Sequence, residues 1–263
     1  MASLDRPLAT ILDSERHVLR SNIVEDAYEL AIWVPPEYES GSAPYPTLYV
    51  LDSPGFFSLS VPIVLGQIWD GMLPDMIVVG VGKQISSLDE WWPVRGRDYA
   101  PVALSASPGS GHADEFRDCL REELIPYVEQ HFRTDPSDRT LWGHSLGGAF
   151  VLHLLLQPDT TFQRCIATSP AVVLDGQRLI DIDDVADAEA LSTTVLFVSA
   201  GSLDEDHLPH IEAVRDALRL RDNRGLQFNY ALLEGQHHIS AAPGGFLTGI
   251  QSVFNVRPHR SAR

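Results

Sequence analysis

Cationic side chains, cysteines and long apolar runs are all scarce in this chain of 263 residues. Lysine and arginine number 19 against 36 aspartates and glutamates, so the formal net charge is −17. Nucleic acids and anionic membrane surfaces are poor partners for so acidic a chain, because both repel like charge. No apolar run approaches the ~18 residues of a membrane-spanning helix. We therefore expect no nucleic-acid partner and no membrane contact.

The two cysteines, Cys119 and Cys165, are too few for a disulfide framework and have no zinc-ligand spacing. We expect both to be buried thiols that pack as small hydrophobic groups. The first residues contain no apolar signal-peptide core, so we expect a cytoplasmic protein. The sequence makes no prediction of oligomeric state.

The length and the segment pattern favour one α/β domain spanning residues 1–263, with flexible termini at about 1–12 and 256–263. Apolar runs typical of strands alternate with helical patterns, which predicts a mostly parallel, doubly wound sheet flanked by helices. We expect strands at 29–34, 47–51, 76–81, 139–143, 162–167, 194–200 and 226–233. We expect helices at 62–69, 113–132 (broken or kinked at Pro126), 146–156, 208–220 and 245–254.

The most informative motif is Gly143-His144-Ser145-Leu146-Gly147, which lies between an expected strand and an expected helix. Gly-x-Ser-x-Gly in this context is typical of a nucleophile elbow, a tight turn that exposes the serine at the sheet edge. The Leu146 amide is then the first candidate donor to an oxyanion. A glycine-rich helix start with an inert serine is the alternative.

A serine nucleophile needs a base and an acid, which follow it along the chain in α/β-hydrolases. His237 and His238 follow the last expected strand; we prefer His238, which is set further into the loop, and His237 remains open. The acid is expected after the strand at 194–200. Asp204 is the first choice there, with Glu205 and Asp206 behind it. A solvated acidic loop that caps the next helix is the other interpretation of Asp204.

The second oxyanion donor is expected after the strand at 47–51. Pro54 has no N–H, so the Ser53 amide is the candidate. Phe56 is a candidate wall of the acyl pocket, and core packing is its alternative.

These residues resemble the putative-esterase (esterase D-like) family of α/β-hydrolases, similar to siderophore trilactone esterases and feruloyl or acetylxylan esterases. The resemblance covers roughly residues 16–250 and includes the stretches 33–38, 95–101, 123–128, 143–148 and 234–240. It implies an α/β-hydrolase fold with Ser145 as nucleophile, His238 as base and Asp204 as acid. Ile239 departs from the family, where glycine is often found. Some siderophore esterases of the family lack a firm acid, so a Ser-His dyad stays open.

Two further residues are candidate substrate contacts. Arg97 either faces the substrate or forms an internal ion pair, since arginine pairs well with carboxylates. Trp91 and Trp92 cannot both face one way on an extended chain, and we take Trp92 as the pocket residue.

We therefore expect a serine esterase that cleaves a small-molecule carboxylic ester through a Ser-His-Asp triad and an acyl-enzyme. No metal ion and no organic cofactor is required. The alternatives are an acyltransferase that uses the same residues and a non-catalytic binding protein on the same fold.

Overall fold

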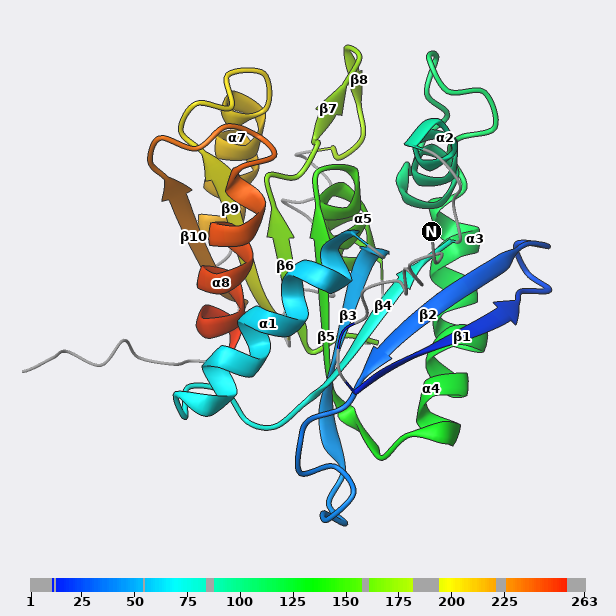
Figure 1. Ribbon diagram of the computed structural model, residues 1–263. Coiled ribbons are helices and arrows are strands. Elements are labelled where there is room, and N and C mark those ends of the chain that lie inside the picture. Colours follow the sequence, from blue (N-terminus) through cyan, green and yellow to red (C-terminus); the bar gives the residue numbers. More distant parts are fainter. Residues whose placement is uncertain are drawn as a thin grey trace, which may run out of the picture.

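The fold is built around one eight-stranded sheet with the order β1-β2-β4-β3-β5-β6-β9-β10 (Figure 1). The computed structural model describes residues 11, 13–53, 55–83, 88–157, 161–181, 194–220 and 226–254. The strands are β1 (Ser14–Arg20), β2 (Ala27–Trp33), β3 (Tyr45–Ser53), β4 (Ile77–Gly82), β5 (Thr134–His144), β6 (Arg164–Thr168), β9 (Val195–Gly201) and β10 (Gln227–Leu233). The flexible termini expected at 1–12 and 256–263 fall outside the described residues, except for Ile11.

Six strands from β4 to β10 are parallel, whereas β2 pairs antiparallel with β4 and β1 pairs antiparallel with β2 at the edge. The apolar runs of β3 and β4 are buried along nearly their whole length, as expected for strands covered on both faces. Because parallel strands end at one edge of a sheet, the segments that follow β3, β5, β9 and β10 meet there. That edge positions the site.

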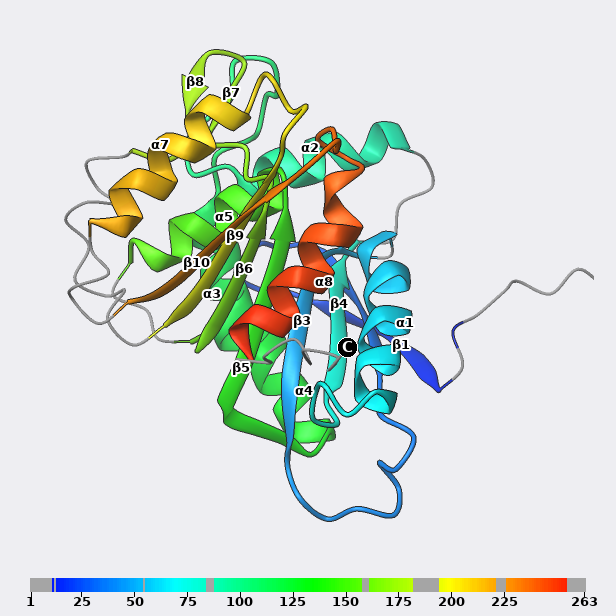
Figure 2. The same ribbon diagram turned by 90° about the vertical axis from the view of Figure 1, so that its left-hand side faces the viewer.

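Helices cover both faces of the sheet (Figure 2). On one face lie α1 (Gly55–Trp69) and α8 (Ala241–Val253), which pack with Trp142 and Phe197 in one core cluster. The other face carries α3 (Ala113–Cys119), α5 (Leu146–Leu155) and α7 (Leu208–Arg219) over a larger core cluster. Among the described residues, no helix has both the length and the apolar character needed to cross a bilayer. The α/β-hydrolase fold expected from the sequence is confirmed.

The helix expected at 113–132 is interrupted just before Pro126. The π-helical turn η1 (Leu120–Leu124) separates α3 from α4 (Ile125–His131), and Pro126 falls in the first turn of α4. The backbone stays helical through Leu124 and Ile125, and the Ile125 N–H bonds to the Leu120 carbonyl oxygen, five residues back. This wider turn accommodates the proline, which has no N–H to donate.

Three elements are missing from the sequence-based expectation: β1, α2 (Leu88–Tyr99) and the hairpin of β7 (Val173–Leu174) and β8 (Gln177–Arg178). The expectation of an extended chain at Trp91 and Trp92 is wrong, because both lie in α2. In the sequence, Pro93 argues against a helix at this place. The acidic residues of the first turn, which include Asp89, favour one through the helix dipole.

Candidate active site

Ser145 occupies a sharp turn between the end of β5 and the start of α5. Its φ of 58° lies in the left-handed region, which costs a non-glycine residue on the order of 1–3 kcal/mol. The turn requires Gly143, because a Cβ there would lie 2.2 Å from the carbonyl oxygen of Gly147. The elbow geometry expected from the Gly-x-Ser-x-Gly pattern is therefore present.

The structure brings Ser145, His238 and Asp204 together at the carboxyl ends of β5, β10 and β9. Ser145 Oγ lies 2.8 Å from Nε2 of His238. Nδ1 of the same ring lies 2.7 Å from Asp204 Oδ2. Asp204 is 5% exposed, so its carboxylate is shielded from water. The three groups form one continuous hydrogen-bond chain from carboxylate to hydroxyl.

The alternatives left open by the sequence lie outside this chain of hydrogen bonds. His237 is exposed, and its Nδ1 contacts the carbonyl oxygen of Leu203 at 3.1 Å. Glu205 and Asp206 are both exposed on the turn that follows Asp204. Contact with Ser145 therefore distinguishes His238 from His237, and contact with His238 distinguishes Asp204 from its two acidic neighbours.

A second imidazole, that of His144, lies beside His238. The ring centroids are 5.0 Å apart. Burial, followed by the nearby charge of His238, holds the pKa of His144 well below its usual value, so its ring is neutral. Burial also lowers the pKa of His238, although the hydrogen bond and charge of Asp204 oppose that effect. A neutral His238 is the form that accepts a proton.

Arg95 is a site residue that the sequence reasoning missed. It reaches from α2 to Asp52 near the end of β3, with Nε 2.8 Å from Oδ1 and Nη2 3.1 Å from Oδ2. Nη2 also donates to the carbonyl oxygen of His144 at 3.2 Å, next to Ser145. Burial raises the pKa of Asp52, and the Arg95 guanidinium opposes that rise. A carboxylate that ends a buried strand is the sequence signal for such a partner.

Arg97, the arginine proposed as a substrate contact, points into an internal cluster instead. Its guanidinium pairs with Asp26 and Asp98 at 2.6 Å each and donates to Tyr28 Oη at 3.1 Å. Arg97 is not among the residues that line the cavity beside the elbow. The structure thus favours the internal ion pair over the substrate-facing alternative, because two carboxylates already occupy the guanidinium.

Ser53 and Phe56 flank the elbow from β3 and α1. Ser53 is 5% exposed and pairs in register with Gly82 of β4. The Phe56 ring packs edge-on against Trp142 and His144, with centroids 5.2 and 5.5 Å away. Phe56 therefore supports the elbow by packing, which is the alternative that the sequence left open, and it does not line the cavity.

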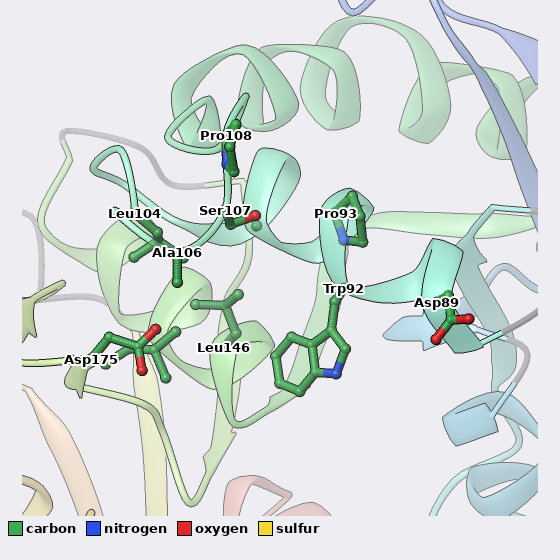
Figure 3. Close-up of a pocket in the computed structure, with 11 residues that line it drawn as sticks. Asp89, Trp92, Pro93, Leu104, Ala106, Ser107, Pro108, Leu146 and Asp175 are labelled. Atoms are coloured by element: carbon green, nitrogen blue, oxygen red, sulfur yellow. The ribbon is translucent and has the colours of Figure 1, made fainter.

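A cavity of about 540 Å³ opens beside the elbow between α2, the 101–112 segment and the β7–β8 hairpin (Figure 3). Its lining is mostly apolar and includes Leu146 and the expected pocket residue Trp92. In Figure 3 these two side chains lie between the carboxylates of Asp89 and Asp175. The cavity size is in the range of small-molecule sites.

One cluster near the elbow has the residue types of a metal site. Asp204, His207 and His238 offer ligand atoms within 4.8 Å of one another. Hydrogen bonds from both rings to the Asp204 carboxylate account for that closeness. These ligand atoms already form hydrogen bonds with one another, and we assign no metal to them.

Comparison with known proteins identifies the family. The family model described as Putative esterase matches residues 21–245. The chain is 26% identical to ferri-bacillibactin esterase BesA of Bacillus subtilis over 89% of this chain and 87% of the relative. It is 24% identical to the siderophore triacetylfusarinine C esterase of Aspergillus fumigatus over 98% and 99% of the two chains. An IroE-like serine hydrolase from Shewanella oneidensis shares the fold, with a TM-score of 0.81, 22% identity and coverage of 92% of this chain and 80% of that one. The chain therefore belongs to this esterase family.

Proposed function

We propose that the protein hydrolyses carboxylic esters through Ser145, His238 and Asp204 by way of an acyl-enzyme. The single observation that carries the proposal is the hydrogen-bond chain from Ser145 Oγ through both nitrogens of His238 to Asp204. A hydroxyl within 2.8 Å of a neutral imidazole can pass its proton as it attacks a carbonyl.

In the first step, Ser145 Oγ bonds to the ester carbonyl carbon and its proton moves to His238 Nε2. Asp204 stabilises the imidazolium that results. The Leu146 N–H, at the N-terminus of α5, and the Ser53 N–H are the proposed donors to the tetrahedral oxyanion. His238 then returns the proton to the departing alkoxide, and the alcohol leaves. Water, activated by the same ring, cleaves the acyl-enzyme and restores Ser145.

The substrate class that we propose is the ester linkage of a siderophore or a similar oligoester. The support comes from a bacterial relative named ferri-bacillibactin esterase and a fungal relative named siderophore triacetylfusarinine C esterase, each matched over most of both chains. The cavity beside Leu146 has the size and the apolar lining to receive one acyl unit of such a molecule.

A fluorophosphonate probe and a panel of esters test this proposal. The intact protein should be labelled once, on Ser145, and Ser145→Ala should abolish both labelling and hydrolysis of aryl esters, lactones and siderophore esters. Ser58→Ala, which changes an exposed serine on α1, is the matched control and should behave as the wild type. Labelling that persists in Ser145→Ala would refute the proposal.

The same panel distinguishes hydrolysis from acyl transfer. An ester that is turned over slowly should add one acyl mass to the intact protein, which water then removes. If an added alcohol, but not water, discharges that acyl group, the protein is an acyltransferase.

A further inference from the structure

Asp204 accepts hydrogen bonds from two imidazoles, and the proposed mechanism uses only one of them. His238 Nδ1 contacts Oδ2 at 2.7 Å, and His207 Nδ1 contacts Oδ1 at 2.9 Å. The rings of His207 and His238 also stack, with centroids 4.3 Å apart and planes 21° apart. The second imidazole therefore contacts both the acid and the base.

The turn before α7 brings His207 to this position. The backbone N–H groups of His207 and Leu208 both donate to the Asp204 carbonyl oxygen, at 3.2 and 2.8 Å. One short turn thus fixes the acid and the second imidazole relative to each other. His238 arrives from the segment after β10 and packs its ring against His207. The side chain of His207 is 18% exposed, whereas that of Asp204 is 4% exposed.

We propose that His207 is a positioning residue for the proposed hydrolysis, because it holds the Asp204 carboxylate by Oδ1 and the His238 ring by stacking. The inference rests on the proposed function. With a donor on each oxygen, the carboxylate cannot rotate without breaking a hydrogen bond. With a flat ring behind it, His238 keeps the plane in which Nε2 points at Ser145 Oγ. Within the described part of the chain, His207 contacts Asp204 and His238 and is not among the residues that line the cavity beside the elbow.

The arrangement also affects the protonation of the base. The groups that face His238 are Asp204, His207, His144 and Arg95. Burial is the largest cause of its lowered pKa; Asp204 raises that pKa, and the charges of His207 and Arg95 lower it. Without His207, the full charge of Asp204 acts on His238. The pKa of His238 then rises, and a higher pH is needed to keep the base neutral.

The test measures the rate of fluorophosphonate labelling between pH 5 and pH 9, which needs no knowledge of the natural substrate. His207→Phe keeps a ring but loses the donor. We expect its plateau rate to fall about three- to tenfold, the typical net contribution of one hydrogen bond. We expect its acid limb to move up by about half a pH unit. His207→Gln restores a donor and should recover much of the rate. His210→Phe changes an exposed histidine in the first turn of α7; it is the matched control and should match the wild type.

Proton NMR adds a readout that a merely structural role would not change. Two low-field imidazole N–H resonances are expected in the wild type, and His207→Phe should lose one of them and keep the other. The inference is overturned if the wild type is labelled but His207→Phe and His207→Gln keep its rate and its acid limb. It is also overturned if a chelator abolishes labelling, since the three residues would then bind a metal. An unlabelled wild type, by contrast, would refute the proposed function itself.

Discussion

Two buried carboxylates flank Ser145, and their partners differ. Asp204 follows β9 and accepts from the imidazoles of His238 and His207. Asp52 lies near the end of β3 and accepts from the guanidinium of Arg95. Both carboxylates are nearly inaccessible, with side chains 4% and 1% exposed. The difference therefore lies in what each partner can do with a proton.

An imidazole exchanges protons near neutral pH, whereas a guanidinium stays charged. The Asp204 side of the site can thus relay a proton to and from Ser145. The guanidinium on the Asp52 side keeps its charge. Its Nη2, which donates to Asp52, also donates to the carbonyl oxygen of His144, directly before Ser145. We infer that the Asp204 side performs the chemistry, whereas the Asp52 side holds the backbone of the elbow in its strained form.

The largest effect is expected on the Asp204 side. Asp204→Asn should lower kcat by about 10⁴-fold, because the amide stabilises neither the imidazolium nor the required tautomer of His238. The unfolding free energy should fall by no more than about 1–3 kcal/mol, since the amide keeps the volume of the carboxylate but can accept through only one of its two atoms. The measurement is ester hydrolysis together with urea unfolding. Asp206→Asn, on the same turn but exposed, should keep nearly full activity, and an equal loss there would contradict the assignment of the acid.

Substitutions on the Asp52 side should instead lower the stability of the fold. Arg95→Met leaves a buried carboxylate without its partner and should lower the unfolding free energy by about 3–5 kcal/mol. Replacing both members, with Arg95→Met and Asp52→Leu, should recover part of that loss, because an apolar pair avoids the desolvation cost. Urea unfolding of the two single variants and the double variant measures the coupling. If the losses simply add, the ion pair does not hold this side together.

The sequence predicts the proton-relaying side better than the fixed side. Ser145, Asp204 and His238 follow from the elbow motif and from chain order, because the loops after parallel strands meet at one edge. Chain order cannot separate His238 from His237, since that choice depends on a tertiary contact, the one between His238 Nε2 and Ser145 Oγ.

The fixed side depends on α2, which the sequence reasoning missed because Pro93 argues against a helix there. Once α2 forms, residues two apart point about 200° away from each other around its axis. Arg95 therefore reaches Asp52, whereas Arg97 reaches Asp26 and Asp98. The exposed edge strand β1 is missed for a related reason, because its charged sequence lacks the apolar run that predicts the central strands.

A smaller effect is expected in the pH dependence of activity and of unfolding. The pKa of His238 is lowered from 6.5, so the base stays neutral below that pH, and the acid limb of kcat/KM should lie under pH 6.5. Unfolding must be measured over the same range. The pKa of His144 is also lowered on folding, so its contribution to stability is present above pH 6.5 and is lost as the pH falls. A reversible acid limb centred above pH 6.5 in folded protein would contradict the assigned environment of the base.

The smallest effect concerns a third kind of carboxylate, one that faces the cavity. Asp89 and Asp175 are exposed on its lining, and neither side chain forms an ion pair or hydrogen bond within the described part of the chain. Their charge should disfavour an anionic acyl group relative to a neutral one of the same size. Asp89→Asn and Asp175→Asn should each raise kcat/KM for a succinate half-ester about two- to fivefold and leave the matching butyrate ester unchanged.

High salt should reduce this selectivity in the wild type, because exposed charges are screened. Asp70→Asn, a surface change at the end of α1, serves as the control for net charge alone. If that control shifts the ratio of succinate to butyrate esters as much as Asp89→Asn does, the selectivity comes from the overall charge of −17. In that case the carboxylates of the cavity would contribute no specific discrimination, and only the two buried carboxylates beside Ser145 would have distinct roles.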